Sequence, residues 1–353
     1  MATGHAWVLE RAGAPLVQRS VPIAAPGPME AVVEVIACGL CHTDLGYADG
    51  SVRPNHVLPL VLGHEIVGQV VAAGAQFAAL IGCTVIVPAV LPCGACAFCL
   101  AGRGNACPQQ KMPGNDIDGG FGSHVVVPAA PLVRLDGVPD GMPTWPLAVV
   151  ADAVSTAWQA VARAQVEAGD AVFVVGAGGV GSYVAQIAAT LGARVVACDV
   201  DHGRLDQVQR LGIGQICHVR DRAAREVRQE LHALAANWGI PSLRWRIFEC
   251  SGTLAGQTLA FALLARAATL VQVGYCAKPL ELRWSNLMAF DATVYGSWGC
   301  PPLAYPAVLA HIFSGAVRVD VGVASAPMSQ INNLLATMAD HRLDRRMVLD
   351  PRA

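Results

Sequence analysis

The apolar positions of this chain follow one pattern before about residue 151 and another after it. From Ala31 to about Leu135, short β-branched runs alternate with Gly and Pro, and the clearest runs are 32–36, 66–72, 84–87 and 123–127. Short, evenly spaced runs are typical of an all-β barrel or sandwich. From residue 151 to about residue 283, strand-like runs alternate with helical periodicity, which predicts a parallel sheet with crossover helices.

A short apolar strand at 293–298 and a tail with helical spacing at 302–313 follow. We therefore expect both ends of the chain, residues 1–153 and 298–353, to build one β-rich domain. Residues 154–297 form a second domain inserted between them. The 353 residues exceed what one hydrophobic core usually organises, which agrees with two domains.

A glycine-rich turn stands at the start of the second domain. Gly176, Gly178 and Gly181 fit the spacing G-x-G-x-x-G between an apolar run and an alanine-rich stretch of helical character, and Gly179 and Val180 complete the turn. Without Cβ atoms, such a backbone lets a pyrophosphate reach the free N–H groups of a helix N-terminus. A second strand ends at Asp199, where a carboxylate suits the ribose hydroxyls and repels a 2′-phosphate. The pattern predicts NAD rather than NADP, with a plain structural turn as the alternative.

Composition narrows the classes of function. Apolar residues make up 54% of the chain and charged residues 14%, which indicates well-buried cores. A net charge of −2 gives no reason to expect nucleic acid or an anionic membrane as a partner. The first residues lack a signal-peptide pattern, and no uninterrupted apolar stretch reaches about 18 residues. We therefore expect a cytoplasmic protein without a membrane span.

Four of the twelve cysteines are regularly spaced. Cys93, Cys96, Cys99 and Cys107 form C-x2-C-x2-C-x7-C in a glycine-containing loop at about residues 92–108. Four thiolates can surround one tetrahedral zinc ion and leave no position open for a substrate. We expect a structural zinc site here, with free thiols as the alternative.

Two shorter motifs flank predicted strands, Cys41-His42-Thr43-Asp44 and Gly63-His64-Glu65. Each alone is weak evidence, because a lone histidine at a strand end is usually structural. Together with the glycine turn and the four cysteines, they resemble the zinc-containing, medium-chain alcohol dehydrogenase family over essentially the whole chain. The resemblance implies an α/β fold, with a Rossmann doubly wound parallel sheet inserted into a β-rich, GroES-like catalytic domain.

The resemblance also implies a catalytic zinc ion. Cys41, His64 and Asp152 correspond to its ligands, although many relatives have cysteine where this chain has Asp152, and Glu65 corresponds to a transient ligand. One thiolate, one carboxylate and one neutral imidazole leave the Zn²⁺ shell formally neutral. The harder oxygen ligand should make the metal a slightly stronger Lewis acid.

Other roles are implied in the same way. Thr43 matches the hydroxyl that accepts the alcohol proton, and Asp44 should orient His64. Leu45-Gly46-Tyr47 offers no histidine for the proton relay of some relatives. Arg346 is expected to reach both the nucleotide pyrophosphate and Asp44. The remaining expected nucleotide contacts are His42, Arg204, Gly274 and Ser297.

Several runs, including residues 55–65 and 285–302, resemble one branch of the family, the 6-hydroxycyclohex-1-ene-1-carbonyl-CoA dehydrogenases. That branch implies NAD-linked oxidation of an allylic ring alcohol, held as an acyl-CoA thioester, in anaerobic benzoyl-CoA degradation. Arg53 and His56 are candidate contacts for this substrate, and water addition to the enoyl product is a further hypothesis.

Two alternatives stay open, a general dehydrogenase of a small secondary alcohol or polyol and a non-catalytic, zinc-stapled NAD-binding scaffold. We also expect a homodimer or homotetramer, paired through an edge strand near residues 280–284.

Overall fold

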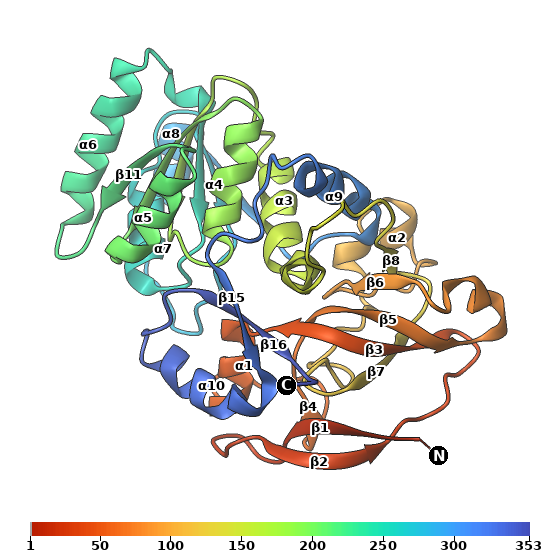
Figure 1. Cartoon of the computed structure of the whole chain (residues 1–353). Coiled ribbons are helices and arrows are strands. Elements are labelled where there is room, and N and C mark those ends of the chain that lie inside the picture. The colour runs from red at the N-terminus through yellow and green to blue at the C-terminus, as the bar shows by residue number, and fades with distance from the viewer. Residues whose placement is uncertain (1) are drawn as a thin grey trace. The chain divides into compact units, whose positions relative to one another are not determined.

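The computed structural model describes residues 2–353, and the chain divides into two compact units (Figure 1). The first unit comprises residues 1–155, 299–313 and 319–353, and the second comprises residues 156–298 and 314–318. The expected boundary lay at 153/154, where helix α3 (Ala153–Arg163) begins. The observed division falls two residues later, inside that helix, and it also gives residues 314–318 to the second unit.

The first unit is built around two β-sheets. A seven-stranded sheet has the order β15-β16-β3-β5-β6-β8, with β7 paired to β3, and a three-stranded sheet has the order β2-β1-β4. The strands are β1 (Thr3–Leu9), β2 (Val17–Pro22), β3 (Glu30–Gly39), β4 (Leu60–Val61), β5 (Glu65–Ala73), β6 (Thr84–Val87), β7 (His124–Pro128), β8 (Val133–Arg134), β15 (Val323–Pro327) and β16 (Arg346–Asp350). The four runs that the sequence marked as strands therefore correspond to β3, β5, β6 and β7.

Strands from the two ends of the chain meet in the larger sheet. C-terminal β16 pairs antiparallel with β3, joining Val348 to Gly39 and Leu349 to Cys38. One core, which includes Leu9, Val33 and Phe121, fills the space beside the sheets. The helices of this unit are α1 (His42–Asp49), α2 (Ala97–Leu100), α9 (Tyr305–Phe313) and α10 (Ile331–Ala339).

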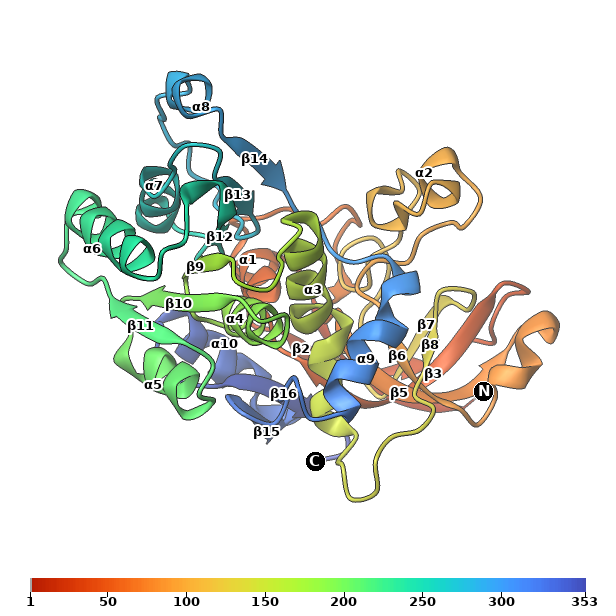
Figure 2. The same cartoon turned by 90° about the horizontal axis from the view of Figure 1, so that it is seen from above.

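The second unit carries a six-stranded parallel sheet of order β11-β10-β9-β12-β13-β14, which Figure 2 shows strand by strand. Its strands are β9 (Ala171–Val175), β10 (Arg194–Asp199), β11 (Gln215–His218), β12 (Trp245–Glu249), β13 (Thr269–Gln272) and β14 (Thr293–Gly296). Its helices besides α3 are α4 (Gly181–Thr190), α5 (His202–Arg210), α6 (Ala224–Asn237), α7 (Leu254–Ala262) and α8 (Ser285–Phe290). The predicted doubly wound sheet is confirmed.

The two faces of this parallel sheet are both covered, as parallel strands require. Val196 and Cys198 of β10 belong to the core beneath α6 and α7, whereas Ala197 packs with Leu205 of α5 on the other face. Because successive side chains of a strand alternate between faces, a nearly continuous apolar run serves both layers.

One prediction about the second unit is wrong. Residues 280–284, the expected edge strand, have no strand structure, and the edge of the sheet is β14. Pro279, two charged side chains and Trp284 interrupt any alternation there, and the segment leads into α8 without regular secondary structure. Within residues 2–353, no helix has both the length and the apolar character needed to cross a membrane.

Candidate metal centres and nucleotide-binding turn

The four spaced cysteines converge on one point in the first unit. The Sγ–Sγ distances are 3.5 Å for Cys96–Cys99, 3.6 Å for Cys93–Cys107, 3.7 Å for Cys96–Cys107 and 3.9 Å for Cys93–Cys99. A tetrahedron with Zn–S bonds of about 2.3 Å has edges of about 3.8 Å, so the thiols already have the spacing of a zinc shell. Backbone N–H groups of Ala95 and Cys96 lower the pKa of Cys93 to about 6, which favours the thiolate that binds metal.

The second cluster is assembled where strands of the large sheet begin or end. Cys41 is the N-cap of α1, two residues after the end of β3, and Glu65 is the first residue of β5. The carboxylate of Asp44 accepts hydrogen bonds from the Cys41 N–H (2.9 Å) and the Gly63 N–H (3.1 Å). Asp44 therefore ties the helix that carries Cys41 to the turn that carries His64.

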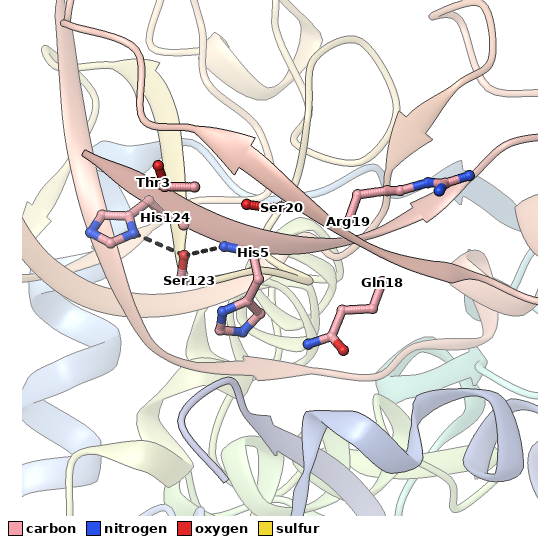
Figure 3. Close-up of a pocket in the computed structure, with 8 residues that line it drawn as sticks. Thr3, His5, Gln18, Arg19, Ser20, Ser123 and His124 are labelled. Atoms are coloured by element: carbon pink, nitrogen blue, oxygen red, sulfur yellow. Dashed lines mark hydrogen bonds between the residues drawn. The ribbon is translucent and has the colours of Figure 1, made fainter. Parts of the chain in front are cut away.

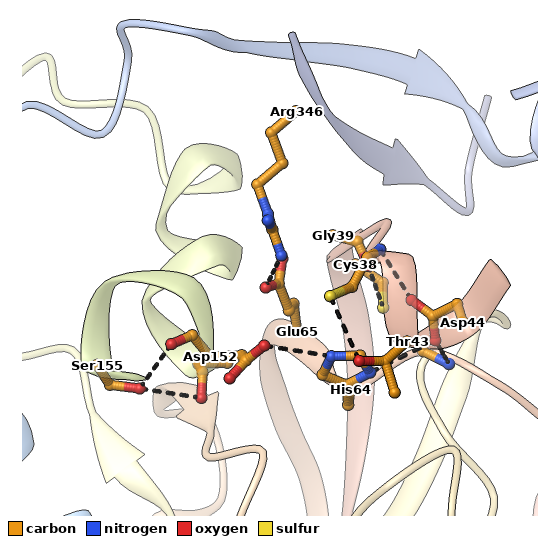
Figure 4. A network of polar contacts seen from close by, with 12 residues as sticks. Cys38, Gly39, Thr43, Asp44, His64, Glu65, Asp152, Ser155 and Arg346 are labelled. Carbon is orange, nitrogen blue, oxygen red and sulfur yellow. Dashed lines mark hydrogen bonds and ion pairs between the residues drawn. The ribbon is translucent and has the colours of Figure 1, made fainter. Parts of the chain in front are cut away.

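Asp152 comes from a third segment, between the 3₁₀ helix Trp145–Ala151 and α3. One ligand atom from each of Cys41, His64, Glu65 and Asp152 lies within 4.8 Å of all the others. Figure 4 labels three of these residues, His64, Glu65 and Asp152. His64 Nε2 stands 3.4 Å from Asp152 Oδ2, which is about the ligand–ligand edge of a tetrahedral zinc site with N and O donors at about 2.0–2.1 Å.

His64 shows why this cluster suits a cation. Both of its ring nitrogens are buried without a hydrogen-bond partner among residues 2–353, and Nδ1 lies 3.4 Å from Asp44 Oδ1. Burial lowers the pKa of His64, but the carboxylates of Asp44 and Asp152 together with Cys41 outweigh it and hold this pKa well above its usual value. A bound divalent ion supplies the positive charge that this surrounding favours.

Arg346 pairs with Glu65 and not with Asp44, the partner that the resemblance implied. The buried carboxylate of Glu65 is held by Arg346 of β16 in a bidentate ion pair, with Arg346 Nε donating to Oε2 at 2.9 Å. The expected contact between Arg346 and Asp44 is thus replaced, because the Asp44 oxygens are occupied by backbone N–H groups and His64. Arg346 closes the cluster on the side of Glu65 (Figure 4).

Two residues that hold Asp152 were missed in the sequence. The hydroxyl of buried Tyr305, on α9, donates to the carbonyl oxygen of Ala151 at 2.6 Å, and Ser155 Oγ donates to the Tyr305 oxygen at 3.0 Å. Ser155 Oγ also reaches the Asp152 carbonyl oxygen at 3.2 Å. Ser155 could have been predicted, because it lies three residues after Asp152 and can bond back to its carbonyl oxygen. Tyr305 is 154 positions from Ala151, and no pattern near it predicts the contact.

The glycine turn connects β9 to α4 in the second unit. Gly176 has φ +94, and a Cβ atom there would lie 2.6 Å from the Ser251 nitrogen. A Cβ at Gly181 would collide with the carbonyl oxygen of Gly176. Only glycine therefore permits this close turn, which leaves the N–H groups before α4 open to an anion.

Asp199 ends β10 beside the turn. Its Oδ2 accepts from the Ala177 N–H at 2.7 Å and its Oδ1 from the Asp201 N–H at 3.0 Å. The Arg204 guanidinium lies 3.9 Å from Asp199 Oδ2 and close to Gly178. The structure thus brings Asp199 and Arg204 together with the glycine turn.

The remaining expected nucleotide residues lie in both units. Gly274 packs against Gly252 and Glu249 in the second unit, and a side chain there would collide with the Gly252 backbone. Ser297 has a buried hydroxyl without a hydrogen-bond partner among the described residues. His42 opens α1 in the first unit and is exposed.

A separate cavity of about 500 Å³ lies beside the β1–β2 hairpin of the first unit (Figure 3). There, Ser123 Oγ accepts a hydrogen bond from the His5 N–H at 3.1 Å and lies 3.0 Å from His124 Nδ1. The lining contains none of the predicted site residues. Arg53 and His56, the candidate acyl-CoA contacts, are exposed and do not line it either.

The second unit has a parallel sheet with a glycine turn. The β-rich first unit of the same chain has a four-cysteine lobe and a Cys/His/Glu/Asp cluster. This combination defines a zinc-type dehydrogenase. Comparison with known families agrees. The model described as "Alcohol dehydrogenase GroES-like domain" matches residues 27–140, and the model described as "Zinc-binding dehydrogenase" matches residues 179–314.

Individual relatives are similar over most of their length. L-galactonate-5-dehydrogenase of Escherichia coli is 30% identical over 86% of this chain and 85% of that protein. An alcohol dehydrogenase of Rhizobium meliloti is 29% identical over 99% of both chains. The alcohol dehydrogenase structure from Aeropyrum pernix superposes with a TM-score of 0.88 at 26% identity, covering 98% of this chain and 100% of that one. This chain belongs to the zinc-type, medium-chain alcohol dehydrogenase family, and the expected GroES-like and Rossmann fold is confirmed.

Proposed function

We propose that the protein catalyses the NAD-dependent oxidation of a secondary alcohol to a ketone, with Cys41, His64 and Asp152 as the ligands of a catalytic zinc ion and Glu65 beside them. The observation that carries the proposal is the convergence of these donor atoms within 4.8 Å, in a chain that also has the glycine turn and Asp199. When bound, zinc supplies Lewis acidity toward an alcohol oxygen and NAD supplies a hydride acceptor.

The side chains around the cluster have distinct tasks. Thr43 Oγ1 lies 3.8 Å from Cys41 Sγ, so its hydroxyl stands beside a ligand and can accept the proton that an alcohol O–H loses. Asp44 orients the His64 ring through Nδ1, which leaves Nε2 for the metal. Because Gly46 offers no imidazole, Thr43 is the residue of this helix that we assign to the proton.

Nucleotide binding is assigned to the second unit. The open N–H groups before α4 suit a pyrophosphate, and Asp199 suits two ribose hydroxyls but repels a 2′-phosphate. The expected preference is therefore NAD over NADP. An Asp199→Ser variant should narrow this preference, whereas Asp201→Ser, which changes the neighbouring helix cap, serves as the matched control.

The substrate proposal has two candidates. The sequence runs that resemble one branch of the family favour an allylic ring alcohol carried as a CoA thioester. The name of the galactonate relative favours a polyol or hydroxy acid instead. Turnover of NAD with 6-hydroxycyclohex-1-ene-1-carbonyl-CoA, with the matching cyclohexenol and with L-galactonate separates them. A higher kcat/KM for the thioester than for the free alcohol supports the first candidate, and turnover of galactonate alone refutes it.

Zinc content tests the proposal independently of substrate. The purified full chain should hold two zinc ions, one for each cluster. Asp152→Asn should lose the catalytic zinc ion and the activity, because the amide cannot supply the carboxylate charge. The zinc ion of the four-cysteine lobe should remain. A wild-type chain with one zinc ion, held by the lobe, and no turnover on any alcohol would support the non-catalytic scaffold instead. Incubating the 6-oxo enoyl-CoA without nucleotide tests the hydration hypothesis.

For assembly, we propose a homo-oligomer that pairs through the edge strand β14. Its Tyr295 is 37% exposed, and the neighbouring Trp284 and Met288 are 65% and 78% exposed. An edge strand beside exposed apolar side chains favours pairing with another copy. Light scattering on wild type and on a Val294→Pro variant tests this, because proline removes an N–H from that strand.

A further inference from the structure

Two free cysteines that the proposed reaction does not use lie next to each other in the second unit. Cys198 of β10 and Cys217 of β11 are partners in the register of these parallel strands, near one edge of the sheet (Figure 2). Both residues are buried in the core beneath α6. Neighbouring strands lie about 4.8 Å apart, which is within the Cα–Cα range of about 4.4–6.8 Å for a disulfide.

Cys217 lies directly beneath a surface ion pair. Arg222 Nη1 donates to the Cys217 sulfur at 3.5 Å, and the Cys217 thiol donates to Glu230 Oε1 at 3.7 Å. Arg222 and Glu230 are paired at 2.5 Å, and their side chains are 30% and 51% exposed. These two partly exposed side chains lie between Cys217 and the solvent, whereas Cys198 lies one strand further in.

The pKa values of the two thiols are shifted in opposite directions. The hydrogen bond with Cys198 lowers the pKa of Cys217, and Arg222 acts in the same direction, against burial and the charge of Glu230. The same hydrogen bond and burial raise the pKa of Cys198 well above its usual value. The thiolate of Cys217 is thus favoured over that of Cys198, which makes Cys217 the thiol that reacts first with an oxidant.

We propose that Cys198 and Cys217 form a peroxide-sensitive dithiol that closes to a disulfide. The Cys217 sulfur attacks one peroxide oxygen, the O–O bond breaks, and the departing hydroxide takes up a proton, leaving a sulfenic acid on Cys217. The Cys198 sulfur then attacks the Cys217 sulfur, the S–O bond breaks, and the hydroxyl group leaves as water with the Cys198 proton. Together the thiols lose two electrons and two protons, and the peroxide becomes two water molecules.

The bond forms one residue before Asp199, whose carboxylate holds the Ala177 N–H of the glycine turn. A new link between β10 and β11 at this level changes the position of Asp199 relative to the turn. We therefore expect the disulfide to weaken NADH binding. This consequence rests on the proposed function, whereas the formation of the bond does not.

The test treats the zinc-loaded, reduced full chain with hydrogen peroxide, alkylates the remaining thiols and maps the unreduced peptides by mass spectrometry. The expected product is a cross-linked pair of peptides that contain Cys198 and Cys217. In Cys198→Ser, the sulfenic acid on Cys217 persists and is captured by dimedone. In Cys217→Ser, Cys198 stays alkylatable. Cys276→Ser, at a half-buried cysteine of the same unit, is the matched control and keeps the cross-link.

Arg222 supplies a kinetic test. Each unit by which the pKa of Cys217 rises removes about tenfold of its thiolate but makes that thiolate about threefold more nucleophilic, so oxidation slows about threefold per unit. Arg222→Gln should therefore slow Cys217 oxidation, and Arg222→Lys should retain most of the rate. An unchanged rate in Arg222→Gln, or alkylation of Cys217 after peroxide as complete as that of Cys276, overturns the proposal.

NADH affinity is measured by titration on the same reduced and oxidised samples that are used for the peptide map. Affinity that falls on oxidation and returns with dithiothreitol in wild type, but stays constant in Cys217→Ser, supports the link to the nucleotide. A mapped disulfide with unchanged NADH affinity supports the peroxide-sensitive dithiol but refutes its effect on NADH binding. Reduced protein that does not bind NADH at all refutes the proposed function instead.

Discussion

The ion pair between Glu65 and Arg346 makes a testable prediction about how much stability and zinc each single variant loses. The Glu65 side chain is 0% exposed and that of Arg346 is 10% exposed, and two hydrogen bonds join them beside the proposed zinc ligands. We predict that Glu65→Gln and Arg346→Gln both destabilise the first unit, because each leaves one buried charge without its partner.

The size of the effect follows from that burial. Removing one partner of a buried ion pair costs about 3–5 kcal/mol. For a domain of about 150–250 residues, 1 kcal/mol corresponds to about 2–4 °C in Tm, so each variant should unfold roughly 6–20 °C below wild type. The double variant Glu65→Gln/Arg346→Gln should be less unstable than the sum of the single variants by about 1–3 kcal/mol.

The nearby metal makes the two single variants unequal. In Arg346→Gln, the lone Glu65 carboxylate lies within reach of a bound Zn²⁺, which compensates its charge. In Glu65→Gln, the lone Arg346 guanidinium is repelled by the same ion. Glu65→Gln should therefore lose more stability and more catalytic zinc than Arg346→Gln.

Thermal unfolding and zinc content per chain, measured on the same samples, check this prediction. Arg19→Gln is the matched control, since Arg19 and Glu10 form a 2.5 Å pair whose side chains are 55% and 47% exposed. An exposed pair contributes only about 0–1 kcal/mol. Single variants as stable as Arg19→Gln, or a larger zinc loss in Arg346→Gln than in Glu65→Gln, would refute the reasoning.

Three further predictions concern separate features. Cys107→Ser should remove the zinc ion of the lobe and lower Tm while one ion per chain remains, as metal analysis would show; retention of both ions contradicts the shell. Gly176→Ala should strongly lower the Tm of the second unit and abolish NADH binding, because its φ is +94 and a Cβ there would lie 2.6 Å from the Ser251 nitrogen. Gly178→Ala, whose nearest new contact is 3.6 Å away, should keep Tm and weaken NADH binding; equal Tm losses in the two variants would count against this distinction. Asp170→Asn should destabilise the second unit by about 1.5–3 kcal/mol, because its buried carboxylate accepts a hydrogen bond at 2.8 Å from Arg244, whose side chain is 37% exposed; a urea midpoint equal to wild type would contradict it.

Sequence patterns determined those parts of the protein that depend on neighbours along the chain. The turn at Gly176 follows from a local need for a backbone without Cβ atoms, and the lobe from four cysteines within fifteen consecutive residues, Cys93–Cys107. The alternation of strands and helices after residue 151 likewise predicts the parallel sheet, because each crossover helix has its own periodicity. The apolar run at 293–298 predicted the strand β14, but which strand lies at the edge depends on the order of the strands in the sheet, which the sequence does not record.

The contacts between distant residues were decided by tertiary structure alone. Arg346 pairs with Glu65 across 281 positions, and Tyr305 supports Ala151 across 154 positions. Cys198 and Cys217 become neighbours only when β10 and β11 pair in register. Periodicity shows which face of an element is buried, but not which strand or helix lies opposite. The partner of a buried charge or thiol is therefore set by how the elements pack, and no pattern along the chain records it.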